Sequence, residues 1–309
     1  MAITLNWNSR GQTVSAVKIY RSTGRFDNMS LIANIDGTTT SYQDTSVVAN
    51  KLYYYKVVLV IGSEEVPGSL QPMVSWSTLG PGSQTLISGT VEWGYFGKLS
   101  VAEFFSVTTL SAALTTPANW SVNTVNPITV WRKYAYFGKI LYIPDMQLYS
   151  SSSTTSAAIN TLYGAGMFYG NDSVAKIAAI TQAATLQNKR VTKDAYEFKV
   201  RAPTANTYVD PTTTYAAADT TKFDTNTSEL MLMVSISNYA SPSAITTMTI
   251  FPRVTSIEPP PANVANVITQ HFANANQLRV GYNFTTSQTL ITTSNSNSIA
   301  FIPILELVQ

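Results

Sequence analysis

The stretch Lys51-Leu-Tyr-Tyr-Tyr-Lys-Val-Val-Leu-Val-Ile61 decides the fold of the first part of this chain. Its aromatic and β-branched residues favour a strand over a helix. Because side chains alternate between the two faces of a strand, the odd-numbered residues 53–59 share one face and the even-numbered residues 54–60 share the other. We expect the even-numbered face, which carries Lys56, to be the face in contact with water.

On both sides of this stretch, short apolar and polar alternations are separated by turn residues, which is typical of an antiparallel β-sandwich. We predict strands at Ile3–Trp7, Val14–Arg21, Ser30–Ile35, Thr40–Asp44, Lys51–Ile61 and about Ser69–Trp76. The pair Glu64-Glu65 lies between turn residues, and adjacent strand residues point to opposite faces, so this pair indicates a solvated hairpin.

Several of these segments resemble a fibronectin type III or immunoglobulin-like module. They are the early strand ending in Trp7, Lys18-Ile-Tyr-Arg-Ser22, Gly37-Thr-Thr-Thr-Ser-Tyr-Gln-Asp-Thr45 and Tyr53-Tyr-Tyr-Lys-Val-Val58. The resemblance places Tyr53 at the tyrosine corner of the family. Such a module normally has one more strand before the Trp-containing one, and Trp7 follows Met1 too closely to leave room for it. That edge is therefore open, is covered by a loop, or receives a strand from another segment or subunit.

The composition combines few charges with many neutral polar residues. Hydrophobic residues make up 45% of the 309 residues and charged residues only 12%, about half of the ~25% of an average soluble protein. Ser, Thr, Asn and Gln replace the missing charges. Neutral hydroxyl and amide groups are easier to bury than ions once they are hydrogen-bonded, so this surface suits a protein that assembles with others.

The charge balance excludes several partners and chemistries. Lys and Arg total 19 and Asp and Glu 17, and the resulting net charge of +2 is too small for a dedicated nucleic-acid or anionic-membrane binder. The absence of cysteine excludes disulfides, thiol catalysis and cysteine-based metal sites. We find no signal-peptide pattern and no run of ~18 apolar residues. We therefore expect no nucleic-acid partner, no membrane insertion and folding in a cytoplasm.

The catalytic inventory is small. The single histidine, His271, is the only side chain whose usual pKa lies near neutrality, and Val267-Ile-Thr-Gln-His-Phe272 offers it no second ligand-type residue. Gly80-Pro-Gly82 and Gly164-Ala-Gly166 lack the Lys-Ser/Thr of a phosphate loop and the spacing of a dinucleotide fingerprint. We expect no catalytic residues, no cofactor and no metal site, and keep glycan hydrolysis only as a remote alternative.

A second, larger domain is expected after Gly80-Pro-Gly-Ser83, because glycine and proline interrupt regular elements. We place the fibronectin III/immunoglobulin-like sandwich at residues 1–80, a linker at 81–85 and a β-rich assembly domain at 86–309. The fold class is therefore mainly β, with a few short helices in the larger domain.

Within the larger domain, Val101–Val107 is expected to contain a short helix, and Ser173–Gln187 a longer one because it combines good helix formers with a serine cap. Loops are expected at Ser150–Ser156 and Pro259–Pro261. We predict strands at Ile128–Tyr136, Lys139–Ile143, Tyr196–Arg201, Leu230–Ile236, Thr246–Val254, Gln277–Phe284 and Ile299–Val308.

The segment Val130-Trp-Arg-Lys-Tyr-Ala-Tyr-Phe-Gly-Lys-Ile-Leu-Tyr-Ile-Pro144 resembles one that is common in bacteriophage virion structural proteins, often associated with tails or fibres. Further matches follow in the same order at Leu162–Gly170, Tyr196–Pro203, Ser228–Met233 and Phe301–Val308. The chain departs from the pattern at Ile302, where an arginine commonly precedes the proline, and at Leu230, where a tryptophan is usual.

The resemblance implies a non-enzymatic virion component, foremost of the tail (collar, sheath, baseplate or fibre attachment), whose partners are other virion proteins and copies of itself. Its candidate interface or packing residues are Trp131, Tyr134, Tyr136 and Tyr53, because aromatic side chains anchor both cores and interfaces. We expect Lys133, Lys139, Lys199 and Arg201 to be strand charges that are solvated or paired between subunits.

Two alternatives remain open at this point. The same aromatic residues would also suit a groove for a host surface glycan, as in a glycan- or receptor-binding adhesin of a tail fibre. A capsid decoration protein is the other alternative.

Overall fold

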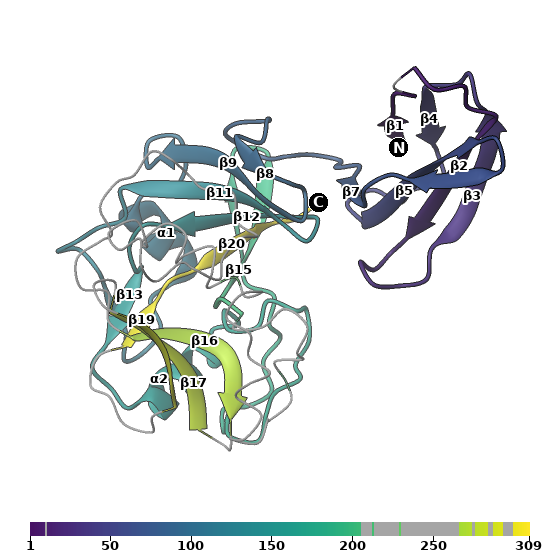
Figure 1. The fold of residues 1–309 in the computed structure, drawn as a ribbon. Helices are drawn as coiled ribbons and strands as arrows, with labels where there is room; N and C mark the ends of the chain where they lie inside the picture. Colours follow the sequence, from purple (N-terminus) through teal and green to yellow (C-terminus); the bar gives the residue numbers. More distant parts are fainter. Residues whose placement is uncertain are drawn as a thin grey trace.

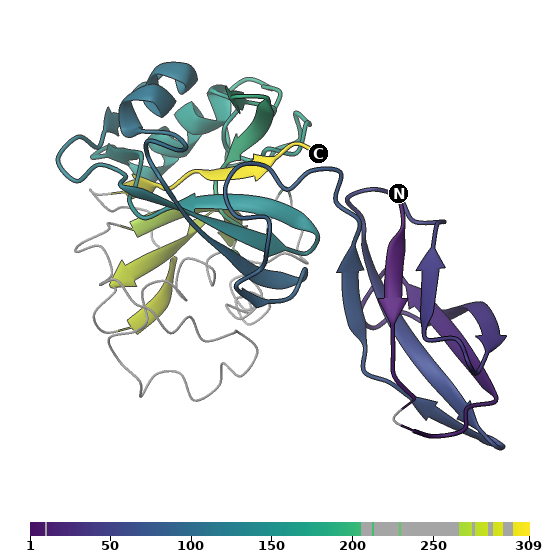
Figure 2. The same ribbon diagram turned by 90° about the horizontal axis from the view of Figure 1, so that it is seen from above.

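The fold was obtained as a computed structural model, which describes residues 1–9, 11–204, 212, 229, 266–273, 276–283, 287–292 and 299–309. The chain is mainly β, with several antiparallel sheets and, in these residues, two short helices, which confirms the predicted fold class. Figures 1 and 2 show two parts joined by a single segment. We call the part built from strands β1–β7 the N-terminal module and the part built from β8–β20 the body.

The N-terminal module is a sandwich of a two-stranded sheet, β1-β4, and a five-stranded sheet in the order β3-β2-β5-β6, in which β7 also pairs with β5. Its strands are β1 (Ile3–Asn6), β2 (Ala16–Ser22), β3 (Ser30–Asp36), β4 (Ser41–Asp44), β5 (Leu52–Ile61), β6 (Glu64–Pro67) and β7 (Gln71–Val74). The last strand predicted at about Ser69–Trp76 contains β7, and β6 is an additional exposed strand that begins at the Glu64-Glu65 pair. The arrangement is that of a fibronectin type III-like sandwich in which, among the described residues, β1 pairs on one side only.

The core of the module lies between these two sheets. Ile3 and Leu5 of β1 pack with Val17 and Ile19 of β2 and with the odd-numbered residues 53–57 of β5. The alternation in β5 therefore selects the core face as predicted. The other face is drier than expected, because Tyr54 and Val58 are buried as well.

The body contains two larger sheets and both helices. Its strands are β8 (Ser88–Gly89), β9 (Trp93–Ser100), β10 (Ser121–Val122), β11 (Val130–Tyr136), β12 (Lys139–Pro144), β13 (Tyr149–Ser151), β14 (Arg190–Lys193), β15 (Tyr196–Arg201), β16 (Asn266–Ala273), β17 (Asn276–Asn283), β18 (Ser287–Thr292), β19 (Ile299–Phe301) and β20 (Ile304–Leu307). The helices are α1 (Val107–Leu114) and α2 (Thr155–Gly164). The seven-stranded sheet has the order β14-β15-β20-β12-β11-β9-β8, and the six-stranded sheet the order β10-β13-β19-β16-β17-β18.

The C-terminal segment crosses from one sheet to the other. The single strand predicted at Ile299–Val308 is instead two strands, β19 in the six-stranded sheet and β20 in the seven-stranded sheet, separated by Ile302 and Pro303. Proline has no N–H to donate to a ladder, so the strand pairing stops there and the chain changes sheets.

The helix predictions need correction. Ser173–Gln187 contains no helix, and its end is tied down instead by the buried side chain of Gln187, which accepts hydrogen bonds from Phe168 N and Tyr169 N. Helix α1 begins at Val107, the last residue of the segment Val101–Val107 in which a helix was predicted. It begins there because the side chains of Ser106 and Thr109 form a capping box at its start. Helix α2 begins inside the predicted loop Ser150–Ser156.

The predicted strands Leu230–Ile236 and Thr246–Val254, the loop Pro259–Pro261 and the segment Ser228–Met233, apart from Glu229, lie outside the described residues.

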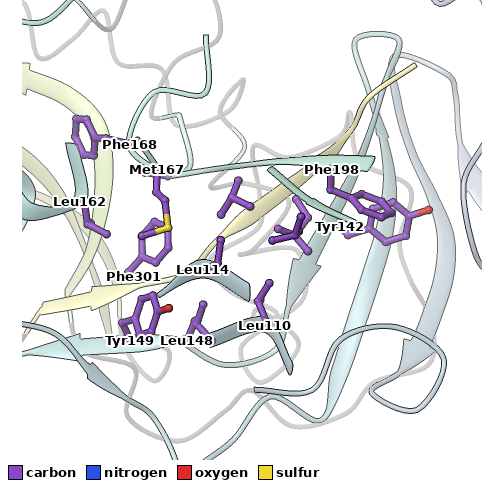
Figure 3. Close-up of a cluster of buried hydrophobic side chains, with 14 of the residues drawn as sticks. Leu110, Leu114, Tyr142, Leu148, Tyr149, Leu162, Met167, Phe168, Phe198 and Phe301 are labelled. Carbon is purple, nitrogen blue, oxygen red and sulfur yellow. The ribbon is translucent and has the colours of Figure 1, made fainter. Parts of the chain in front are cut away.

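The body has its own hydrophobic core, which shares no residue with the core of the module. Figure 3 shows how Leu110 and Leu114 of α1 lie near Leu148 and Tyr149, while Tyr142 and Phe198 meet edge-on toward the other end of the cluster. Leu162, Met167 and Phe168 close the side near Phe301 of β19. The core therefore joins the two sheets and both helices into one unit.

Candidate functional site

Trp131 of β11 lies inside the body. Its ring is fully buried, its Nε1 donates a hydrogen bond to Phe105 O at 2.7 Å, and its ring meets that of Phe104 edge-on at 5.2 Å between centroids. Because both the ring and its N–H are occupied within the chain, Trp131 packs the core.

Tyr134 and Tyr136 of β11 are also buried, against the neighbouring strand β9. The ring of Tyr134 lies 5.3 Å from that of Tyr95, and the ring of Tyr136 lies 4.7 Å from that of Trp93. The register of β11 against β9 shifts between Lys133 and Tyr134, because β9 has one extra residue there, Phe96. Because both side chains are buried, the ring faces of Tyr134 and Tyr136 are not accessible to a sugar at the surface.

Tyr53 at the start of β5 forms a tyrosine corner, as the resemblance implied. Its hydroxyl accepts a hydrogen bond from Val48 N at 3.0 Å, five residues upstream, and its ring is buried. The guanidinium of Arg21 lies 5.0 Å from the ring centroid, within the range of a cation–π contact. Tyr53 therefore fixes the loop that enters the longest strand of the module.

Lys133 was expected to be a solvated or intersubunit charge, and the structure contradicts this. Its side chain is 0% exposed, with Nζ 4.8 Å from the ring centroid of Phe96. Nζ donates a hydrogen bond to Ser83 O at 2.6 Å. Burial lowers the pKa of Lys133 from its usual 10.5 to about 8. The sequence of β11, VWRKYAY, does not predict this burial, because Lys133 is covered by the segment around Ser83, which crosses over the strand.

That crossing segment is the predicted linker. The hydroxyl of Tyr142 donates to Pro81 O at 2.9 Å, and Lys133 holds Ser83 O. A Cβ at Gly80, whose φ is +68°, would lie 2.6 Å from the Tyr142 hydroxyl, so this close passage requires glycine. Residues 80–83 are thus bound to the seven-stranded sheet of the body.

Arg201 of β15 was likewise expected to be solvated or paired between subunits, but it is buried and paired within the chain. Its guanidinium forms two hydrogen bonds with the carboxylate of Glu229 and one, through Nε at 3.0 Å, with Glu306 Oε2 of β20. Burial alone would raise the pKa of Glu306, but the charges of Lys139 and Arg201 outweigh it and lower that pKa to about 2.

Two other predicted strand charges also have partners within the chain. Lys139 pairs with Glu306 at 3.1 Å and remains half-exposed. Lys199 pairs with Asp172, which Arg190 also contacts. The first of these pairs links the interior strands β12 and β20 of the seven-stranded sheet.

Glu92 is a buried carboxylate at the junction between the module and the body. It is 3% exposed, and it accepts a hydrogen bond from Tyr54 OH at 2.6 Å and one from Arg25 Nη1 at 2.5 Å, both of the module. Its own carbonyl accepts from Phe137 N at 2.8 Å, within the β11–β12 hairpin. This one residue therefore connects the module to the body's largest sheet.

A second contact at the junction involves the same hairpin. Trp76 Nε1 donates to Gly138 O at 2.9 Å, and a Cβ at Gly138 would lie 3.3 Å from Leu52 of β5. At the chain end, Gln309 Nε2 donates to Thr78 O at 2.7 Å, and Figure 1 shows this end beside the joining segment. The junction is therefore built from at least three separate hydrogen-bonded contacts.

The two-stranded sheet of the module has an uncovered edge. Within the described residues, β1 pairs with β4 alone, in the register Ile3↔Asp44 to Asn6↔Ser41. Ile3 and Leu5 face the core, whereas Thr4 and Asn6 are exposed. Among the described residues, no strand pairs with the other edge of β1.

His271 lies in strand β16. Across the described residues, no three His, Cys, Asp or Glu side chains come together in a way that could hold a metal ion. Among the described helices, none has the length and apolar character needed to cross a membrane.

Sequence reasoning missed Glu92 and misjudged Lys133. A usable signal for Glu92 was its position in Val91-Glu-Trp93, a lone charge among apolar residues at the start of a buried strand. Such a charge is seldom buried without a partner, so the segment could have been predicted to contact a cation.

No protein family and no curated protein matches this chain. Among solved structures, the chain is similar to the twitchin kinase region from C. elegans (Fn31-NL-kin-CRD-Ig26), with 12% sequence identity and a TM-score of 0.21. The match covers 46% of this chain and 28% of the twitchin chain. A TM-score this low carries no argument, so the fold assignment rests on the strand order and the tyrosine corner.

Proposed function

We propose that this chain is a non-enzymatic structural component of a bacteriophage virion, foremost of its tail, and that it works by assembling with other virion proteins and with copies of itself. The ordered segments from Val130–Pro144 to Phe301–Val308 support a virion origin, because they resemble such proteins. The low charge supports assembly, because neutral polar groups are buried at small cost.

The observation that carries the assembly role is the uncovered edge of β1 on a module that is tied to the body. Unpaired strand edges are templates for association. Glu92 and Trp76 hold the module against the hairpin of β11 and β12, so a partner bound at β1 is positioned relative to the whole chain.

The experiment is to purify particles from the phage that encodes this sequence and to locate the chain by mass spectrometry and cryo-electron microscopy. We expect it in assembled particles, at a symmetric position in several copies. Its absence from assembled particles would refute the proposal. Its position would separate a tail role from capsid decoration.

The glycan-binding alternative has less support, because Trp131, Tyr134 and Tyr136 are buried and a sugar would have to stack on other residues. Binding of the full chain to fixed host cells tests it directly. Saturable binding that a cell-surface glycan displaces would favour an adhesin.

A further inference from the structure

The hydrogen-bonding direction of β1 follows from one contact. Trp7 N donates to Thr40 O at 3.1 Å, and these two residues continue the register that pairs Leu5 with Tyr42. In an antiparallel ladder, hydrogen-bonded and non-hydrogen-bonded pairs alternate. The odd-numbered residues of β1 therefore bond to β4, and the backbone N–H and C=O groups of Thr4 and Asn6 point away from β4, toward the uncovered edge.

Charge distinguishes this edge from those of β6 and β14. The edge strand β6 carries Glu64, Glu65 and Pro67, and the edge strand β14 carries Arg190 and Lys193. Charges and proline on an edge oppose pairing with another strand. Residues 2–6, Ala-Ile-Thr-Leu-Asn, contain neither. A two-fold axis brings identical segments together, so a charged edge would repel its own copy, whereas β1 would not.

We propose that β1 pairs in antiparallel fashion with β1 of a second copy of this chain, about a two-fold axis at Thr4. This inference rests on the proposed assembly function and specifies one of its contacts. The hydrogen-bonded pairs must use residues whose backbone groups face the edge. An axis at Thr4 meets this condition within residues 2–6, because it places Thr4 opposite Thr4 of the second copy and Asn6 opposite its Ala2.

The side chains agree with this register. On the outer face, two threonines face each other, a favourable cross-strand pair. On the inner face, Ile3 comes to lie beside Leu5 of the second copy, so the apolar stripe of one module continues into the next. The pairing makes the sheet β4-β1 four-stranded across the two-fold axis.

The test uses the absence of cysteine in the chain. In the full-length protein we would introduce Thr4→Cys, with Asn6→Cys as the matched control, since both side chains are exposed on the same face of the same strand. Opposed residues of a hydrogen-bonded pair lie ~5.5 Å apart, within disulfide range. The two residues at position 6 would be more than ~10 Å apart, because strands rise ~3.4 Å per residue, and could not bridge.

In a glutathione redox buffer, we expect the Thr4→Cys chain to form a disulfide-linked dimer at about ten times the yield of the Asn6→Cys chain. Equal yields from the two variants, or a higher yield from Asn6→Cys, would overturn the register. No dimer from either would overturn the pairing. When the Thr4→Cys chain is mixed with a Gln43→Cys chain, a disulfide between the two variants would also overturn the pairing of β1 with β1. Such a disulfide would indicate head-to-tail contact between β1 of one copy and β4 of the other.

A second measurement covers the chance that cysteine disturbs the strand. Asn6→Pro removes an N–H that faces the open edge and is not used by β4, so the module should keep its fold by circular dichroism. Combined with Thr4→Cys, it should abolish the disulfide-linked dimer, and an undiminished yield would count against edge pairing. These assays use purified protein alone, so their failure is distinct from absence of the chain from virions.

Discussion

Replacing Glu92 by alanine should release the N-terminal module from the body. The substitution removes the acceptor for both Tyr54 and Arg25, whereas the Trp76–Gly138 and Gln309–Thr78 contacts remain. We therefore expect a loosened junction in which each part keeps its own core, because those two cores share no residue.

The magnitude follows from the burial of the groups left behind. Tyr54 is 3% exposed, and its hydroxyl loses a hydrogen bond to a charged group, which is worth about 1.5–3 kcal/mol. The Arg25 side chain is 47% exposed and can return to water, so its lost charged hydrogen bond adds little. The docked arrangement should weaken by about 2 kcal/mol, which is a factor of roughly 30 in the docking equilibrium.

Small-angle X-ray scattering of the full chain measures the spread of the two parts, and differential scanning calorimetry measures whether they unfold together. For Glu92→Ala we expect a larger radius of gyration and a separation of the two unfolding transitions. The matched control is Glu65→Ala. Glu65 also lies 2.5 Å from a cation, Lys18, but that pair is exposed and outside the junction.

Tyr54→Phe should show a smaller effect in the same direction, because Glu92 then keeps Arg25 as its partner. The reasoning would be refuted if Glu92→Ala and Glu65→Ala gave the same scattering profile and the same calorimetric trace. The carboxylate would then contribute nothing to holding the module.

Three further predictions concern buried polar groups. Tyr53→Phe should lower the free energy of unfolding of the module by about 1–2 kcal/mol, because it removes the corner hydrogen bond; chemical denaturation measures this, and an unchanged midpoint would contradict the assignment. Gln187→Ala should lower the free energy of unfolding by about 3 kcal/mol or more, because the buried side chain forms four hydrogen bonds. Increased proteolysis near residue 187 would show that the loop has loosened. Between pH 8 and 10 the unfolded chain binds a proton at Lys133 that the folded chain does not, so the free energy of unfolding should rise with pH in that window. Above pH 10 it should fall, because burial keeps the phenols of Tyr55 and Tyr142 protonated only in the folded state. Urea titrations of Lys133→Met should lack the rise, and a pH profile parallel to that of the unchanged protein would disprove the burial of Lys133.

The sequence was most informative where burial follows a local period. In the module, the alternation along residues 53–59 and the turn residues between strands identified the sandwich, the core face and the place of Tyr53. These features depend on neighbours along one strand, so a linear pattern records them.

Local patterns failed where distant segments meet. The run Ser173–Gln187 has good helix formers, yet the hydrogen bonds of Gln187 to residues 163–169 outweigh that preference. A propensity of a few tenths of a kcal/mol per residue cannot compete with several buried hydrogen bonds. The ends of Ile299–Val308 were predicted correctly as strand, but the change of sheet at Pro303 depends on which strands lie beside each half.

By itself, the sequence determined a mainly β chain with a fibronectin III-like start, few charges, one histidine and no cysteine. Only the tertiary structure decided that Lys133 is buried under residues 80–83, that Glu92 ties the module to the body, and that β1 has a neutral, unpaired edge. The physical reason is that a residue's charge and hydrogen-bonding capacity are local properties. Its burial and its partners are set by segments far away in the chain.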